Sequence, residues 1–502
     1  MKKNVLLFLL VFFMLALPVF AGGRSASSSG DATELRIMIR NIGMASTNDN
    51  IINRELEKRT GLKLNWDLKP SEGYNQAFVT VIASGDYPDA VEFGGAYPVG
   101  LQELADDGVI RPVDDLVAKY GPEFTPAVRP ANNWFVSTKD GKRYAIPTRT
   151  FDFGIVRGML IRKDWMNMLG LQMPKNSDDY FNVLTAFAQN AERLVGPGKR
   201  LVPHGTGDYQ NNMVDGCFLN YLRSENGMIR EWNRVDGKLV HSVNMPAFKN
   251  VLLTARKFYQ AGLIEPEFPI ITSRDDMVNI IASKRYAAWD WYLDSIDEET
   301  APLAAQIYAA APELRNNLAI IPYFQDRTGN WRFTQTIDRS QMIIFNKTSE
   351  AKAINVVKLM NYIVSKDGFY LTELGIEGEH YTIDNSGRVK VKDMTIEERA
   401  KLGHWNYAWV AKRSYIPIAA SDYVRNTMQN EFGLSHGIDS PLAYGKFWTQ
   451  YGSALDSLRR QYQTELITRK DINFDAMYTE FVNTWNAQGG AQVTQEMNEM
   501  YR

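Results

Sequence analysis

The chain has 502 residues, too many for a single hydrophobic core, which predicts two or more domains. Hydrophobic residues make up 45% and charged residues 23%, as is usual for soluble globular proteins, and the formal net charge of -2 without a basic cluster argues against a nucleic-acid partner. Cys217 is the single cysteine, so no intramolecular disulfide can form, and its apolar neighbours predict a buried small side chain.

The N-terminus has the pattern of an export signal. Lys2 and Lys3 precede an apolar run at residues 5–17, and a proline and small residues follow it. The run is too short to span a bilayer. We therefore expect residues 1–21 to be a cleaved signal peptide, residues 22–32 to be a flexible linker, and the mature protein to be periplasmic or extracellular. No cysteine stands at the cleavage site, so we do not expect a lipid anchor.

The first part of the mature chain alternates short apolar strands with amphipathic helices. Strands are predicted at residues 35–39, 62–67 and 88–93, and helices at residues 48–60, 71–84, 101–107 and 113–120. This alternation predicts a mainly parallel sheet covered by helices. Ligands of such sheets lie beyond the carboxyl ends of the strands, which directs attention to residues 41–48 and to Tyr97 in the loop at residues 94–98.

Residues 141–167 are expected to carry the chain from one α/β half to the other. Arg149 and Asp152 lie between two apolar runs there, and ligand sites favour places where two separately folded surfaces face each other. Arg157 interrupts the second run, at residues 154–161. Since a buried arginine without a partner is costly, Arg157 is expected to face the ligand or a carboxylate, and the first case favours an acidic ligand.

The alternation resumes after this crossing, and the C-terminal region is mostly helical. Ser177 is predicted to be the N-cap of its helix, and residues 195–213 are predicted to be a loop. Helices are predicted at residues 163–169, 177–194, 246–261, 273–283, 349–365, 422–432, 444–466 and 471–486, strands at 285–291, 318–323 and 342–345, and a hairpin at 381–392.

Six segments in this order carry a resemblance to a known family. They are INRELEKRTGLKLNW; IASGDYPDAVEF; KDGKRYAIP with LIRKDWMNMLGLQMPKNSDDYFNVLTAF; GLIEPEF; FNKTSEAKAINVVKLMNYIVSKDGFYLTELGIEGEHY; and FVNTWNAQGGAQVTQEMNEMY. Together they resemble the extracellular solute-binding proteins of ABC importers, in particular the large carbohydrate-type subfamily. The resemblance implies an α/β fold of the two-lobe periplasmic-binding-protein type (type II, clamshell). It places residues 33–149 with 317–378 in the first lobe, and residues 150–316 with 379–502 in the second.

The function that this resemblance implies is capture of a carbohydrate, in particular an oligosaccharide, and its delivery to a membrane permease by a monomeric receptor. Many relatives carry an acidic calcium loop after the helix that matches residues 177–194. Here that segment reads NAERLVGPGKRLVPHGTGD, and its carboxylates are too sparse for the six to eight oxygen ligands that calcium takes. We therefore predict no calcium, no other metal and no cofactor.

Sugar recognition needs aromatic rings that stack on a pyranose and planar polar groups that pair with hydroxyls. The residues predicted to supply both are Tyr97, Arg149, Asp152, Arg157, Trp289, Asp290, Trp291, Tyr292, Trp405, Tyr407 and Trp409. Two structural alternatives stay open. The WDW segment suits a buried strand end whose Asp caps a backbone group, and HWNYAWV suits packing inside a lobe.

Three functional alternatives also stay open: a receptor for a non-sugar solute such as a peptide, a sensory receptor, and a carbohydrate-active enzyme. The enzyme is the least favoured, because no phosphate loop, HExxH, GxSxG or CxxC motif is present. A glycosidase needs only two carboxylates, which a sequence does not reveal.

Overall fold

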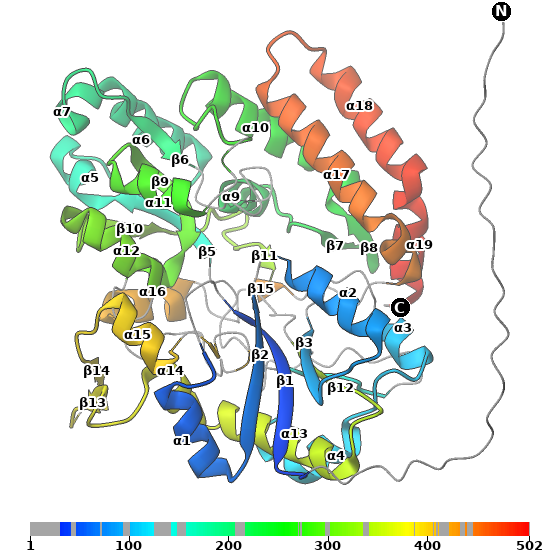
Figure 1. Cartoon of the computed structure of the whole chain (residues 1–502). Helices are drawn as coiled ribbons and strands as arrows, with labels where there is room; N and C mark the ends of the chain where they lie inside the picture. Colours follow the sequence, from blue (N-terminus) through cyan, green and yellow to red (C-terminus); the bar gives the residue numbers. More distant parts are fainter. Residues whose placement is uncertain are drawn as a thin grey trace, which may run out of the picture.

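The computed structural model describes most of the chain and shows two α/β lobes, one above the other in Figure 1. The described residues are 31–41, 47–70, 73–93, 101–124, 142–147, 157–205, 216–269, 271, 274–296, 302–334, 341–385, 387–404, 406–407, 410, 421–431, 437–438 and 445–500. Within these ranges, no helix combines the length and the apolar composition that crossing a membrane requires.

The first lobe is built on a five-stranded sheet in the order β2-β1-β3-β12-β4. β1 pairs in parallel with β2 and β3, and β12 is antiparallel to β3 and β4. The strands are β1 (Glu34–Asn41), β2 (Lys63–Pro70), β3 (Ala90–Phe93), β4 (Ile146–Pro147) and β12 (Gln341–Ile344). The helices of this lobe include α1 (Ile51–Thr60), α2 (Tyr74–Ser84), α3 (Leu101–Asp106), α4 (Asp114–Tyr120), α13 (Glu350–Val364), α14 (Lys366–Leu374) and α15 (Ile396–Leu402).

The second lobe is built on a four-stranded sheet in the order β10-β5-β9-β6. β9 is antiparallel to β5 and parallel to β6. The strands are β5 (Arg157–Arg162), β6 (Val202–Gly205), β9 (Tyr286–Tyr292) and β10 (Leu318–Ile321). The helices around it include α5 (Lys163–Leu169), α6 (Ser177–Gln189), α7 (Ala191–Val195), α9 (Cys217–Glu225), α10 (Phe248–Gln260), α11 (Arg274–Ala282), α12 (Pro302–Ala310) and α16 (Asp422–Glu431).

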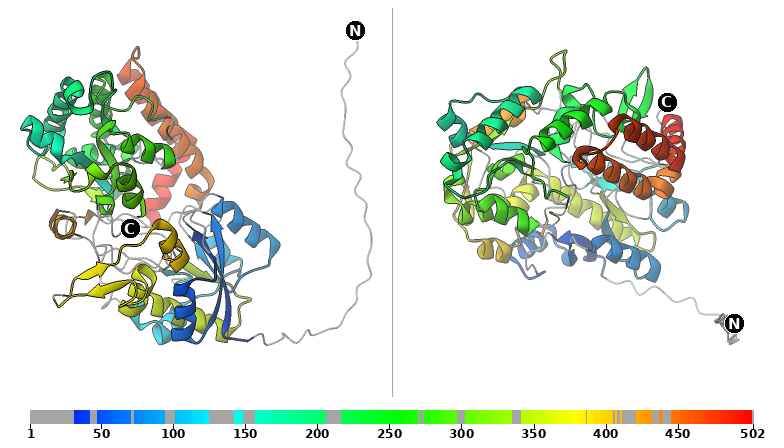
Figure 2. Two further views of the ribbon diagram at one scale, coloured as in Figure 1. Left: turned by 60° about the vertical axis from the view of Figure 1, so that its left-hand side comes forward. Right: turned by 90° about the horizontal axis from the view of Figure 1, so that it is seen from above.

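The C-terminal helices lie on the same lobe as α9 and α10, as the orange and red ribbons of Figures 1 and 2 show. They are α17 (Lys446–Thr468), α18 (Phe474–Trp485) and α19 (Ala491–Met500). Three two-stranded ribbons complete the described strands: β7 (Trp232–Val235) with β8 (Lys238–His241), β11 (Phe333–Thr334) with β15 (Gly437–Ile438), and β13 (Tyr381–Ile383) with β14 (Val389–Val391).

The central strands of the first sheet are buried on both faces, which explains their apolar residues. In β1, Leu35, Ile37 and Ile39 enter one apolar cluster, whereas Met38 enters the cluster on the opposite face. This alternation follows from side chains that point to opposite faces of a strand. The core of the second lobe is one continuous cluster that reaches from the second sheet to Trp485 of α18.

Two local predictions are corrected by the structure. β6 forms within the predicted loop at residues 195–213, because its backbone is completed by pairing with β9, which is distant in the sequence. The N-cap of α6 is Asn176, not Ser177. The extended backbone of Asn176 lets its side chain accept a hydrogen bond from the Asp179 N–H at 2.8 Å.

The predicted division into lobes is also corrected at two places. β10 pairs antiparallel with β5, so residues 318–321 belong to the second sheet, although they were predicted in the first lobe. α15, Tyr407 and Val410 were predicted in the second lobe, yet Leu402 of α15, Tyr407 and Val410 are buried in a core cluster of the first. The chain passes from β4 in the first sheet to β5 in the second within the stretch predicted to cross.

Candidate functional site

The two sheets present the ends of their strands toward each other, and this is where a ligand site is expected. The carboxyl ends of β1 and β3 lie at one edge of the first sheet, which points toward the second lobe in Figure 1. The carboxyl ends of β6, β9 and β10 share one edge of the second sheet with the amino end of β5. Ligands of open α/β sheets bind outside such edges.

A charged pair lies at the edge of the first sheet. Arg40 near the end of β1 contacts Glu92 of β3 through two hydrogen bonds, of 2.8 Å from Nη2 to Oε1 and 3.3 Å from Nε to Oε2. The Glu92 side chain is fully buried, whereas that of Arg40 is 20% exposed. The guanidinium also lies 5.2 Å from the ring centroid of Tyr74, whose hydroxyl donates to the Glu92 carbonyl.

A sequence signal for this pair exists, although no prediction was made from it. Arg40 directly follows the buried apolar run at residues 37–39 of β1, and Glu92 is the charged residue of β3, whose four residues are all buried. Because an isolated buried charge is very costly, each such residue predicts a partner of opposite charge nearby. The partners lie on neighbouring strands, so only the strand order shows that they meet.

The edge of the second sheet is built from buried polar groups of a different kind. Asp290 of β9 is 1% exposed and accepts a hydrogen bond of 3.1 Å from the Phe218 N–H in the first turn of α9. Its Oδ1 faces His204 Nε2 at 3.6 Å, and the Tyr180 hydroxyl lies 2.6 Å from His204 Nδ1. Asp290 therefore caps α9, as one of the two interpretations of the WDW segment proposed.

Burial determines the protonation states of His204 and Tyr180 beside Asp290. Desolvation lowers the pKa of His204 to about 3, so the ring is neutral at neutral pH and does not form an ion pair with Asp290. Burial also raises the pKa of Tyr180, and the nearby Asp290 carboxylate adds to this effect. The edge of the second sheet thus carries one carboxylate among neutral hydrogen-bonding partners.

Burial removes three predicted residues from the set that can touch a ligand. Trp289 and Asp290 are each 1% exposed in the core of the second lobe. Tyr407 is fully buried in the first lobe and packs edge-on against Trp66, with ring centroids 5.4 Å apart. These side chains fill a core, which is the alternative that their sequence pattern left open.

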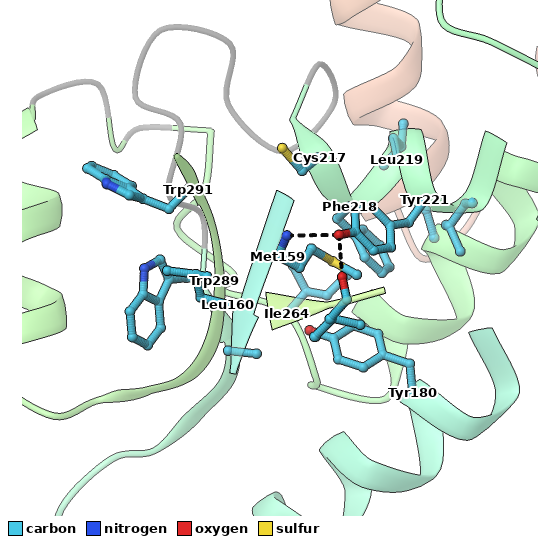
Figure 3. Close-up of a cluster of buried hydrophobic side chains, with 14 of the residues drawn as sticks. Met159, Leu160, Tyr180, Cys217, Phe218, Leu219, Tyr221, Ile264, Trp289 and Trp291 are labelled. Atoms are coloured by element: carbon cyan, nitrogen blue, oxygen red, sulfur yellow. Dashed lines mark hydrogen bonds between the residues drawn. The ribbon is translucent and has the colours of Figure 1, made fainter. Parts of the chain in front are cut away.

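Two predicted residues remain at the edge of the second sheet. Arg157 begins β5 and is partly exposed, and Trp291 lies near the end of β9 on the same side as Trp289 (Figure 3). Trp291 is 3% exposed and belongs to the same core cluster as Trp289. Tyr292 ends β9, and only its backbone is described. Predicted residues outside the described ranges are Tyr97, Arg149, Asp152, Trp405 and Trp409.

In the described ranges, no cluster of three or more His, Cys, Asp or Glu side chains suits a metal ion. A groove of about 490 Å³ lies between α17 and α18, on the C-terminal helices and not between the facing sheet edges. Tyr462 in this groove donates its hydroxyl to Glu480.

Residues 43–368 match the model of the bacterial extracellular solute-binding protein family. The chain belongs to this family. Its members are receptors that bind solutes, and the two-lobe α/β fold predicted from the sequence agrees with the solved structures of related proteins.

Three relatives illustrate the relationship. Lipoprotein LipO of Bacillus subtilis (strain 168) is 23% identical over 95% of this chain and 94% of its own length. The fructooligosaccharide ABC transporter substrate-binding protein FusA of Streptococcus pneumoniae serotype 4 is 36% identical over 44% of this chain and 42% of its own. The structure of FusA with kestose superimposes with a TM-score of 0.68 at 19% identity, covering 93% of this chain and 98% of FusA.

The third is a structure of a solute-binding protein from Bifidobacterium longum infantis, described as binding HMO. It superimposes with a TM-score of 0.72 at 16% identity and covers 94% of this chain and 99% of its own. At this identity the likeness shows a shared fold, and the ligand has to be argued from the site.

Proposed function

We propose that this protein is a receptor outside the cytoplasmic membrane that captures a carbohydrate, in particular an oligosaccharide, and delivers it to an ABC permease. The observation that carries the proposal is the 36% identity to FusA over 234 residues, because FusA is named for binding fructooligosaccharides within an ABC transporter. Membership of the solute-binding family supports a binding role over an enzymatic one.

The ligand would bind between the facing edges of the two sheets. A ligand favours a closed form only when it contacts both lobes more strongly there than in an open form. On the first lobe, Arg40 offers a guanidinium whose orientation is fixed by Glu92. On the second, Arg157 begins β5 and is partly exposed, and Trp291 lies near the end of β9.

The remaining predicted site residues stay in the proposal as ligand contacts. They are Tyr97, Arg149, Asp152, Tyr292, Trp405 and Trp409. Residues 148–154, within the stretch predicted to cross between the lobes, are proposed as the hinge. Closure on a ligand would decrease the radius of gyration in X-ray scattering, and an unchanged radius would argue against the clamshell mechanism.

The location and the oligomeric state belong to the same proposal. We expect export through cleavage after Ala21 and a monomer without a lipid anchor, although the relative LipO is named a lipoprotein. Intact-mass measurement of the protein from its native host tests the cleavage and the anchor. A mass that differs from that of residues 22–502 would overturn the cleavage site or the unmodified mature form.

The decisive experiment is a thermal-shift screen of the purified mature chain. The compounds are kestose and longer fructooligosaccharides, milk-type oligosaccharides, oligouronates and short peptides. A ligand at 100 times its dissociation constant adds about 2.7 kcal/mol of stability. A shift with a saccharide supports the proposal. A clear shift with peptides and with no saccharide would retain the fold and overturn the ligand class.

A further inference from the structure

One helix of the second lobe contacts both the sheet edge and the chain that leaves for the first lobe. This helix is α9. Its residues 218, 221 and 224 lie in its first turn, its middle and its last turn. Each of them makes a polar contact with a different part of the second lobe.

The first turn of α9 is held at the ligand-facing edge. The Phe218 N–H donates to Asp290 of β9 at 3.1 Å, and the Phe218 ring packs against the His204 ring with centroids 5.1 Å apart. Asp290 is 1% exposed, so its carboxylate cannot exchange this partner for bulk water. The start of the helix therefore follows the end of β9.

The middle of α9 is joined to two strands through one hydroxyl. The Tyr221 hydroxyl accepts from the Met159 N–H of β5 at 3.2 Å and donates to the Ile321 carbonyl of β10 at 2.7 Å (Figure 3). A Cβ on Gly158 would lie only 3.0 Å from this oxygen, so the glycine leaves it room. The Tyr221 ring also packs on Tyr323, with centroids 4.0 Å apart.

The last turn of α9 holds the chain after β10, which goes on toward β12 in the first sheet. The Ser224 hydroxyl donates to the Phe324 carbonyl at 2.6 Å and accepts from the Arg332 N–H at 2.9 Å. Ser224 is fully buried. One hydroxyl therefore satisfies two backbone groups of this connection, which would otherwise be left without partners.

The connection itself is a compact turn and not a loose linker. Asp326 accepts hydrogen bonds from the N–H groups of Thr328 and Asn330, and its other carboxylate oxygen contacts Arg332 Nε at 3.0 Å. Burial would raise the pKa of Asp326, but these hydrogen bonds outweigh it and lower the pKa to about 2. The turn can therefore move as a unit with α9.

We infer that α9 couples the ligand-facing edge of the second sheet to the connection that leads back to the first lobe, with Asp290 and Ser224 as the positioning residues at its two ends. The inference deepens the proposed function, since it assigns Asp290 to transmission instead of ligand contact. A short, close-packed helix changes position as a body, so a displacement at its first turn reaches its last turn.

The test is amide hydrogen exchange on the full-length mature chain without any ligand. Asp290→Ala removes the acceptor for the Phe218 N–H, so faster exchange there is a local effect. Coupling predicts in addition that the Arg332 N–H, which donates a hydrogen bond to the Ser224 hydroxyl, exchanges about tenfold faster than in the wild type. Asp290→Asn keeps an acceptor oxygen and should restore both amides to the wild-type rates.

The reverse variant keeps the inference testable if Asp290→Ala fails to fold. Ser224→Ala should accelerate exchange at Phe218, at the far end of the helix. Thr185→Val is the control in the same lobe, because it removes a hydroxyl that bonds to the Phe181 carbonyl within α6. Exchange that changes only next to each substitution would overturn the coupling. Since no ligand is used, this result is independent of the saccharide screen.

Discussion

The facing edges of the two lobes use carboxylates in opposite ways. In the first lobe, buried Glu92 pairs with Arg40, whose side chain is 20% exposed and remains within reach of solvent. In the second lobe, Asp290 turns inward and caps a helix, next to a neutral histidine. An acidic residue near a strand end is thus no sign of a ligand contact by itself, since its role depends on the group packed against it.

The largest expected effect tests the charged edge of the first lobe. Arg40→Met leaves the fully buried Glu92 carboxylate without this cation, and we expect the free energy of unfolding to fall by about 3 kcal/mol. Urea denaturation measures the loss. Arg54→Met is the control, because the Arg54–Asp49 pair is exposed and should contribute less than about 1 kcal/mol. Equal losses of unfolding free energy in the two variants would show that the Arg40–Glu92 pair stabilises the fold no more than an exposed ion pair does.

The second prediction concerns the neutral histidines of the second lobe. Burial lowers the pKa of His204 and of His241 to about 3, and the cations of Arg459 and Arg223 contribute to the shift of His241. Below about pH 6.5 the unfolded chain therefore binds protons that the folded chain does not bind. Above that pH these histidines do not change the free energy of unfolding. As the pH falls from 6.5 toward 3, the free energy of unfolding decreases.

The expected size is about 1.4 kcal/mol per pH unit for each histidine, or about 2 kcal/mol each between pH 6.5 and pH 5. Urea denaturation at these two pH values measures it. His204→Gln and His241→Gln should each flatten the pH dependence, even if they lower stability at pH 7. A wild-type slope in both variants would place the acid sensitivity elsewhere.

A third prediction separates two neighbouring rings of β9. If Trp291 contacts a saccharide, Trp291→Ala should weaken binding of the compound found in the screen by about 1–3 kcal/mol. Trp289→Phe should leave the dissociation constant unchanged and lower stability, because Trp289 is a core residue. Isothermal titration and thermal denaturation measure the two quantities. An unchanged affinity for Trp291→Ala in a folded protein removes this ring from the site.

The smallest effects concern the helix caps of the two lobes. Asn50 caps α1 of the first lobe and Asn176 caps α6 of the second, each by accepting a backbone N–H with its side chain. Asn176→Ala should cost about 1 kcal/mol. Asn50→Ala should cost more, because Asn50 is buried and its amide also donates to the Thr47 carbonyl. Ser177→Ala, one residue beyond the cap of α6, should change stability by less than about 0.5 kcal/mol. A larger loss at Ser177 would restore it as the cap.

Local pattern was sufficient for much of the secondary structure. The predicted helix at residues 349–365 corresponds to α13 (Glu350–Val364), because Ala353, Val356, Val357 and Met360 recur at helical spacing and Ser349 caps its start. The hairpin predicted at residues 381–392 is β13 with β14. β6 was missed because four residues without clear alternation carry little local information.

The sequence by itself determined the family, the α/β class and most helices and strands, since these depend on residues close together in the chain. Only the tertiary structure decided that β10 joins β5, that Tyr407 fills the first lobe, and that Asp290 faces α9. Each of these choices depends on a partner distant in sequence. Hydrophobic periodicity shows that a side chain is buried, but it does not show which surface buries it.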